Sequence, residues 1–245
     1  MKNIKNLYFG ILSTAVVTLT SCGSDVYDNT VPTSARVKII HAVADSVSTV
    51  SALVDGAAIS LKPGIADPLT FGLTFPTDST YLRLTEGAHN FKVVPTTGGF
   101  AGLSADASLA ANAYYSIFAV DTVQKIGAVV VKDEIPAPEA GKIAIRFVNL
   151  SPNAPAYDLV LKSGTVLASN IAYKAVSSFV QTEIAVAPDS MVRLEMRAVG
   201  GTTAVKSFNI LRPVSGRVFT IIARGYVGTI PKTFPQALVA TNNAR

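Results

Sequence analysis

Short segments in which apolar and polar residues alternate run along most of the chain. In residues 36–40, Val37 and Ile39 fall on one face of an extended strand and Arg36 and Lys38 on the other, because successive side chains of a strand point to opposite faces. This period of two predicts a strand with one buried face. Similar segments rich in Val, Ile, Phe, Tyr and Thr recur between Gly, Pro, Asn and Asp residues, so we expect an all-β protein. For residues 104–112 alone we expect a short helical turn.

Several of these segments occur twice, in the same order and about a hundred residues apart. The matching pairs are residues 35–41 with 141–147, 50–56 with 156–162, 81–84 with 192–195, and 114–119 with 218–223. Residues 128–131 and 237–240 are expected to close the two copies. Turn residues recur as well: Asp55-Gly56 and Ser163-Gly164 mark one turn, and Gly98-Gly99 and Gly200-Gly201 mark another. We infer an internal duplication of a domain of common size.

These features predict two tandem antiparallel immunoglobulin-like β-sandwich domains, in residues 35–132 and 142–245. Between them, residues 133–141 read DEIPAPEAG, which is typical of a semi-extended linker because of its prolines. The chain has no Trp, so the Cys–Trp–Cys signature of immunoglobulin domains is absent and does not fix the topology.

Residues 1–21 have the pattern of a lipoprotein signal peptide. Two lysines precede an apolar run, residues 7–20, that is too short to span a bilayer comfortably. Leu19 and Ser21 then flank the expected cleavage site in front of Cys22, the only cysteine. We expect cleavage after Ser21, lipid on the Cys22 thiol, and a polar tether in residues 22–34.

This signal predicts a place in the cell envelope. Gly23, not Asp, follows Cys22, which by resemblance to lipoproteins of Gram-negative bacteria predicts the outer membrane. The periplasmic and the cell-surface face both remain open. With Cys22 lipidated, no thiol is left for a disulfide, a nucleophile or a metal ligand. An apolar core must therefore stabilise the fold, and 49% hydrophobic against 15% charged residues allow one.

No catalytic or metal-binding constellation stands out in the sequence. His41 and His89 are isolated, whereas a zinc site needs three or four convergent ligands, so we expect ordinary strand or turn residues. There is no Gly-x-Ser-x-Gly elbow and no distinctive pair of carboxylates. The formal charge is +5, but the basic residues are scattered, which argues against a nucleic-acid partner. We expect no enzyme, no metal and no cofactor.

Residues 149–157, together with the adjoining Asp158, are the best candidate for a binding loop. Two prolines stiffen it, which lowers the cost of ordering on binding. Asn149, Asn153, Tyr157 and Asp158 supply polar groups and an aromatic face. The alternative is that the prolines only shape a connection between strands and that the Asn side chains cap its turns.

Four Asp-Ser or Asp-Thr pairs are followed by an aliphatic residue, Met or Thr. They place the hydroxyls of Ser46, Ser79, Thr122 and Ser190 in a pattern that resembles an O-glycosylation acceptor of some Gram-negative envelope proteins. The same pairs favour tight turns, so ordinary turn chemistry is an equal alternative.

Residues 145–160, IRFVNLSPNAPAYDLV, carry a family resemblance. They are similar to the opening of domain of unknown function 4397 (DUF4397) of bacterial envelope lipoproteins, in which a strand precedes Ser-Pro-Asp-Ala-Pro and then an Asp. Asn153 replaces the first Asp, and Asp158 matches the second. The first copy keeps the strand ending at His41 but lacks the proline loop, so it is a divergent copy. The resemblance implies a β-sandwich on the cell envelope and implies no enzymatic activity.

The sequence as a whole predicts a non-catalytic, lipid-anchored outer-membrane protein with a binding or envelope-organising role and an unknown ligand. Its partner would be an envelope protein or a glycan. Without Trp, only tyrosines such as Tyr157, Tyr173 and Tyr226 offer aromatic surfaces, which favours a protein. A passive structural spacer and, with less support, a hydrolase with a site hidden from sequence are the alternatives. The oligomeric state stays open.

Overall fold

The computed structural model describes residues 34–44, 49–60, 69–77, 80–96, 102–122, 125–184, 191–227 and, for the backbone alone, 236–241. Every regular element in these ranges is a strand, which confirms the all-β prediction for this part of the chain. No helix among the described residues is long and apolar enough to cross a membrane. The predicted signal peptide and residues 22–33 of the predicted tether lie outside the described residues.

Two sheets form the first half. One has the order β4-β1-β8-β9, with β5 also paired to β1, and the other has the order β3-β2-β6-β7. The strands are β1 (Ala35–His41), β2 (Val50–Val54), β3 (Ala57–Ala58), β4 (Thr74–Phe75), β5 (Leu82–Leu84), β6 (Gly87–Pro95), β7 (Leu103–Leu109), β8 (Tyr114–Thr122) and β9 (Lys125–Lys132).

Two further sheets form the second half, with the orders β13-β10-β16-β17 and β12-β11-β14-β15. The strands are β10 (Lys142–Leu150), β11 (Tyr157–Leu161), β12 (Val166–Ile171), β13 (Val180–Glu183), β14 (Met191–Ala198), β15 (Ala204–Leu211), β16 (Val218–Arg224) and β17 (Gln236–Thr241). As expected, β9 and β17 are antiparallel to β8 and β16 and follow them in the chain.

The two halves share one strand order. In each half the first strand pairs in parallel with the penultimate strand, β1 with β8 and β10 with β16. The prediction of purely antiparallel sheets is therefore wrong at this pair. Between the two parallel strands the chain crosses to the other sheet and returns, which supplies the long connection that parallel neighbours need.

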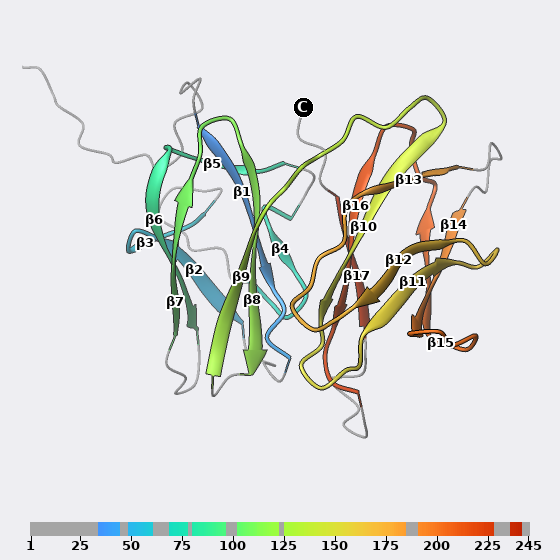
Figure 1. The fold of residues 1–245 in the computed structure, drawn as a ribbon. Coiled ribbons are helices and arrows are strands. Elements are labelled where there is room, and N and C mark those ends of the chain that lie inside the picture. Colours follow the sequence, from blue (N-terminus) through green and yellow to red (C-terminus); the bar gives the residue numbers. More distant parts are fainter. Residues whose placement is uncertain are drawn as a thin grey trace, which may run out of the picture.

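The four sheets stack as layers (Figure 1). Each half has its own core between its two sheets, centred on Val37, Ile39 and Ile117 in the first half and on Ile145, Phe147 and Ile221 in the second. A third apolar cluster lies between the halves, where the β1–β8 sheet faces the β10–β16 sheet. Its members are Ile40, Ala42, Phe118, Val120, Val148, Leu150 and Ile222.

Strand β1 is consequently buried on both faces. Val37 and Ile39 point into the core of the first half, as predicted. The opposite face, which we expected to meet solvent, is covered by the second half, so that Lys38 is only 1% exposed. The correction follows from the third cluster, because a sheet with a neighbour on each side has no solvated face.

A polar network crosses the same interface beside the apolar cluster. Nη2 of Arg146 on β10 lies 2.7 Å from a carboxylate oxygen of Asp133, and the two side chains are 3% and 0% exposed. Ser116 donates to the other Asp133 oxygen at 2.7 Å, and Tyr81 donates to it at 3.3 Å. Nε of Arg146 donates to Thr220 at 2.9 Å. Asp133 opens the predicted linker, so this segment contributes a buried residue to the interface as well as a connection.

Residues 104–112 differ from their prediction, because residues 103–109 form strand β7 and pair with β6. Leu103 and Ala107 pack against the core while Ser104 and Asp106 alternate with them, so the period is two. Small and polar residues hide that period, since Ser and Asp favour neither helix nor core.

The repeat matches need two changes. Residues 81–84 are equivalent to Phe179 and the start of β13, because β5 pairs with β1 as β13 pairs with β10, whereas residues 192–195 lie in β14. The parallel registers pair Lys38 with Ser116 and Arg146 with Thr220, so Lys38 corresponds to Arg146, two residues beyond the sequence match. The hairpin turn at Asp55-Gly56 is confirmed, with φ values of 52° and 84°.

The buried ion pair predicts an asymmetric response to mutation. Arg146→Met should lower the free energy of unfolding by about 3–5 kcal/mol, because it leaves the Asp133 carboxylate buried without its cation. Adding Asp133→Leu should recover part of this loss, since both charges then leave the interface. Urea unfolding of the two variants measures the difference.

The matched control is Lys132→Met, which removes the exposed ion pair of Lys132 with Glu134. It should change the free energy of unfolding by no more than about 0.5 kcal/mol. An Arg146→Met variant as stable as this control would contradict the role given to the buried pair.

Candidate functional site

Asn149, the first residue of the predicted binding loop, has a structural role. It lies in β10 and is completely buried. Its side-chain amide donates to the carbonyl oxygens of Pro155 and Ile171 at 3.2 and 3.1 Å, and its Oδ1 accepts from the Ser151 amide at 3.1 Å. All these partners lie within the same half, so Asn149 shapes the loop from inside.

Asn153 is exposed and joins this loop to the segment after β16. Its Nδ2 donates to the Val227 carbonyl at 2.7 Å, and its Oδ1 accepts from the Val227 amide at 2.8 Å. The Ser151 hydroxyl donates to the carbonyl of Gly225 in the same segment. The two loops therefore form one surface, on which Asn153 is the exposed polar residue of the predicted set.

Tyr157 and Asp158 are buried and face opposite sides of β11. Tyr157 packs in the core of the second half, so it offers no aromatic face to a ligand. Asp158 accepts hydrogen bonds from the amide of Asn170 at 2.7 Å, the hydroxyl of Ser169 at 3.0 Å and the amide of Gly200 at 3.1 Å. Asp158 thereby ties two turns to β11.

The pKa of Asp158 is set by two opposing effects. Burial raises it, but the hydrogen bonds from Asn170, Gly200 and Ser169 favour the ionised carboxylate and bring the pKa below its ordinary value. The charge on Asp158 is therefore part of the folded structure at neutral pH.

A second group of polar residues, which the sequence did not reveal, lies across the boundary between the halves. It is found where the inner strands β1, β8, β10 and β16 end. Asp121 in β8 accepts hydrogen bonds from the Tyr173 hydroxyl and from Lys174 Nζ, the latter at 2.7 Å. Burial raises the pKa of Tyr173, and the hydrogen bond to the charged Asp121 raises it further. Tyr226 lies near enough to raise the pKa of Tyr173 as well, so two tyrosines and one carboxylate lie close together here.

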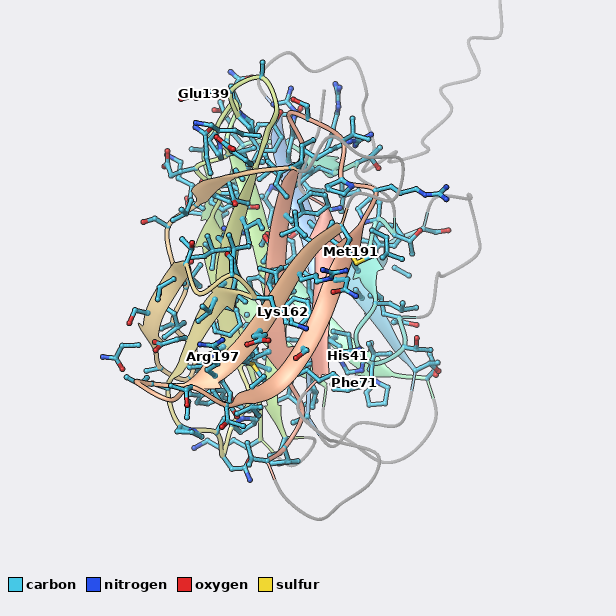
Figure 2. The ribbon with its side chains drawn as sticks, turned by 90° about the vertical axis from the view of Figure 1, so that its right-hand side faces the viewer. His41, Phe71, Glu139, Lys162, Met191 and Arg197 are labelled. Atoms are coloured by element: carbon cyan, nitrogen blue, oxygen red, sulfur yellow. The ribbon has the colours of Figure 1, made fainter. Side chains whose placement is uncertain are left out.

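Arg224, the last residue of β16, makes a second contact between the halves, with Phe71 of the first half. Its guanidinium carbon lies 4.4 Å from the centre of the Phe71 ring, which itself meets the ring of His41 edge-on at 6.1 Å (Figure 2). The chain at Gly72 passes directly under the guanidinium group. A Cβ atom at Gly72 would overlap with Nη1 of Arg224, so any larger residue at this position would have to displace the guanidinium group.

We call this group the distal seam: Phe71, Gly72, Asp121, Tyr173, Lys174 and Arg224. Its residues hold the two halves together at the end of the molecule where β1, β8, β10 and β16 finish. Lys174 is 42% exposed and Tyr173 and Phe71 are half-buried, so the seam also borders solvent. A single charged residue at the end of an apolar run, as Asp121 and Arg224 are, was the available sequence signal.

The histidines occupy structural positions. His41 ends β1 and is 1% exposed. His89 in β6 places Nδ1 2.7 Å from Asp55 Oδ2 and Nε2 2.9 Å from the Thr85 carbonyl. Over the described ranges, no three His, Cys, Asp or Glu side chains are grouped to hold a metal ion.

The remaining predicted sites fall mostly outside the described residues. This applies to Leu19, Ser21, Cys22, Ser46, Ser79 and Ser190. Thr122 is described: it is half-buried and ends β8, next to the connection to β9.

The close approach at Gly72 predicts a large effect of a small change. Gly72→Ala should lower the free energy of unfolding by about 2 kcal/mol or more, because the methyl group meets Arg224 and φ is +83°. Gly216→Ala is the matched control, with φ of +81° and nothing within 4 Å of the added Cβ. It should cost about 1 kcal/mol from backbone strain alone. Equal losses in thermal or urea unfolding would show that Arg224 does not constrain Gly72.

The lowered pKa of Asp158 predicts acid sensitivity. Because the folded pKa lies below the unfolded one, the stabilisation is complete above the unfolded pKa and is lost as the pH falls through the folded pKa. Asp158→Asn should destabilise the protein by about 1–3 kcal/mol at pH 7 and by much less near pH 2–3. Unfolding curves at both pH values measure this. A difference between the proteins that is the same at both would contradict it.

Comparison with known proteins gives a family but no activity. The family model described as "Domain of unknown function (DUF4397)" matches residues 35–160, which span the first half and the opening strands β10 and β11 of the second. The match includes the stretch that carries the resemblance and also the copy that we took to be divergent. No curated protein matches the chain.

Two solved structures are similar only at a low level. A family 41 carbohydrate-binding module from streptococcal virulence factors, reported for alpha-glucan recognition, is 12% identical with a TM-score of 0.25, covering 83% of this chain and 96% of that one. A candidate cell adhesion protein of Bacteroides fragilis is 8% identical with a TM-score of 0.20, covering 86% and 98%. Neither likeness carries an argument about function. The family match covers just over half of the sequence, and the chain therefore belongs to the DUF4397 family.

Proposed function

We propose that the protein is a non-catalytic lipoprotein of the outer membrane, anchored through Cys22, whose folded part is a rigid head that binds an envelope partner at its tether-distal end. The head would consist of two immunoglobulin-like β-sandwich domains that arose by duplication. The single observation that carries the proposal is the common direction of the four inner strands, which separates the loops at their ends from the start of β1.

The direction of the strands follows from the pairings and the seam. β8 runs parallel to β1, and β16 runs parallel to β10. Arg224 at the end of β16 meets Phe71 beside the end of β1, so all four strands finish at one end of the molecule. Ala35 begins β1 at the other end (Figure 1). A tether in residues 22–34 would hold the loops after β1, β8, β10 and β16 away from the membrane.

The contacts between the halves support a rigid head. Three sets of contacts join the halves at different points along the strands. They are the apolar cluster around Phe118 and Ile222, the buried pair of Arg146 with Asp133, and the distal seam. Loops on such a scaffold keep a fixed geometry, which lowers the ordering cost of binding. The loops at residues 151–156 and 225–227 are joined by hydrogen bonds and form one surface at this end.

The side chains of this end favour a protein partner over a glycan. Of the three tyrosines considered for sugar stacking, Tyr157 is buried and Tyr173 and Tyr226 are half-buried. The exposed groups are instead mixed: Asn153, Pro155, Lys174 and Val227. Such a mixture of polar and apolar side chains is ordinary for protein contact surfaces.

Two readouts distinguish the proposal from its alternatives. A passive spacer would have no selective contact at its distal end. A hydrolase would turn over a substrate and lose this turnover on change of one residue in a cleft. Neither a selective partner nor turnover is required for membrane association, so anchoring is tested separately.

Anchoring is tested by fractionation and surface labelling. We expect the wild type in the outer-membrane fraction and Cys22→Ala outside it, because the acyl chains on the Cys22 thiol supply the membrane affinity. A membrane-impermeant biotin reagent applied to intact cells then reports the leaflet. Labelling places the head on the cell surface, and membrane association without labelling places it in the periplasm. A wild-type protein as soluble as Cys22→Ala would overturn the lipoprotein assignment.

Distal binding is tested with a photo-crosslinking amino acid in intact cells. Placed at Pro155 or Val227, it should give the same discrete adduct, because both positions lie on the joined loops. Placed at Glu134, which is 85% exposed on the connection between the halves, it should not. Equal adducts at all three positions, or none at Pro155 and Val227, would favour the spacer.

A further inference from the structure

The two halves face each other through equivalent residues. The parallel pair of β1 with β8 places Lys38 opposite Ser116, and the parallel pair of β10 with β16 places Arg146 opposite Thr220. All four side chains are buried between the halves. Each inner sheet therefore presents a cation beside a hydroxyl at the same place.

An aromatic ring completes both groups. Lys38 Nζ lies 5.1 Å from the centre of the Tyr81 ring, and the guanidinium carbon of Arg146 lies 4.7 Å from the centre of the Phe179 ring. Tyr81 directly precedes β5 and Phe179 directly precedes β13, which are the strands paired antiparallel to β1 and β10. The equivalence thus extends across neighbouring strands.

The same correspondence holds at the distal seam. The Gly72 amide donates to the His41 carbonyl at 2.7 Å, and the Lys174 amide donates to the Asn149 carbonyl at 2.7 Å. Both turn residues have left-handed backbones, with φ of 83° and 65°. The two turns are therefore equivalent in place and in conformation.

Each turn contacts the opposite half. The turn with Phe71 packs against Arg224 at the end of β16, and the turn with Tyr173 packs against Asp121 at the end of β8. The first-half turn thus meets the second-half strand end, and the second-half turn meets the first-half strand end. Such an exchange is what a two-fold axis parallel to the inner strands produces.

We propose that the halves associate as the subunits of a pseudo-two-fold dimer, through a self-sufficient surface that selects the unlike half as its partner. The inference does not depend on a binding role at the distal end. The covalent connection beyond Asp133, residues 134–141, then raises the local concentration of the halves but does not hold them together.

The charges supply the selectivity. Two second halves would bring two Arg146 side chains together without Asp133, which belongs to the other half. The same pairing would place Lys174 against the end of β16, where Arg224 stands, in place of the Asp121 carboxylate. Like charges facing each other in an interface disfavour the wrong pairing, so the unlike pair is preferred.

Cleavage of the connection tests the first part of the proposal. A protease recognition sequence is inserted between Pro136 and Ala137 of the full, lipid-anchored chain, with an affinity tag at the C-terminus, so that Asp133 stays with the first half. After cleavage in detergent, the first half should remain on the tag resin through dilution and washing. Release of the first half, or precipitation of either half, would overturn the proposal.

A charge reversal at the seam tests the surface itself. In the cleaved protein, Lys174→Glu places a carboxylate against Asp121 and should speed the loss of the first half about tenfold at low salt, with a smaller effect at high salt. Lys162→Glu, on an exposed turn of the second half away from the interface, is the matched control and should leave retention unchanged. Equal retention in both variants would overturn the role of the seam.

Exchange between differently tagged copies tests the selectivity. Two cleaved preparations that carry different C-terminal tags are mixed and incubated until their first halves have exchanged. Resin for one tag should then retain first halves from both preparations and no second half bearing the other tag. Joint retention of two second halves would contradict the selection of the unlike half.

Discussion

The buried carboxylate of Asp133 is the constraint on which the arrangement of the halves depends. The two facing sheets each carry a buried cation, Lys38 or Arg146. Their packing requires a counter-charge, because an unpaired ion in a low-dielectric interior costs several kcal/mol. Asp133 meets Arg146 directly and shares a hydrogen-bonded network with Tyr81 and Ser116. An apolar interface alone would tolerate sliding of the sheets. The ion pair and its hydroxyl partners allow one register only, and the cluster around Phe118 then packs in that register.

This fixed register gives the molecule its two distinct ends. One end holds the start of β1 and the connection between the halves, and the other gathers the ends of the four inner strands. At the latter end, two loops of the second half are joined to each other by the hydrogen bonds between Asn153 and Val227. The predicted binding loop thus has a real place in the structure, but most of its predicted residues stabilise it from within. Its outer surface is made jointly with the segment after β16.

The sequence predicts the positions of the strands better than it predicts which of their faces are buried by a neighbouring sheet. The alternation around Val37 and Ile39 identified the core face correctly, since apolar residues at a period of two leave few other structures. The burial of Lys38 could not be predicted, because a lysine that alternates with apolar residues has the same pattern whether water or a second sheet lies beyond it. The two-residue shift between the copies was hidden for a related reason: a shift of two keeps every side chain on its face. Tyr157 likewise gave no sign that its ring points inward.

The parallel pairing of β1 with β8 also governs how each half reaches its folded state. Strand β1 lies inside its sheet and needs neighbours on both edges. One of these neighbours, β8, is the second-last strand of the half, so it is synthesised long after β1. Contacts so distant along the chain slow folding, because the loop between them must be closed before they contribute. Until then β1 displays an apolar face and unpaired backbone groups. During this interval the half is exposed to aggregation, because unpaired strand edges and apolar surface favour association with other chains.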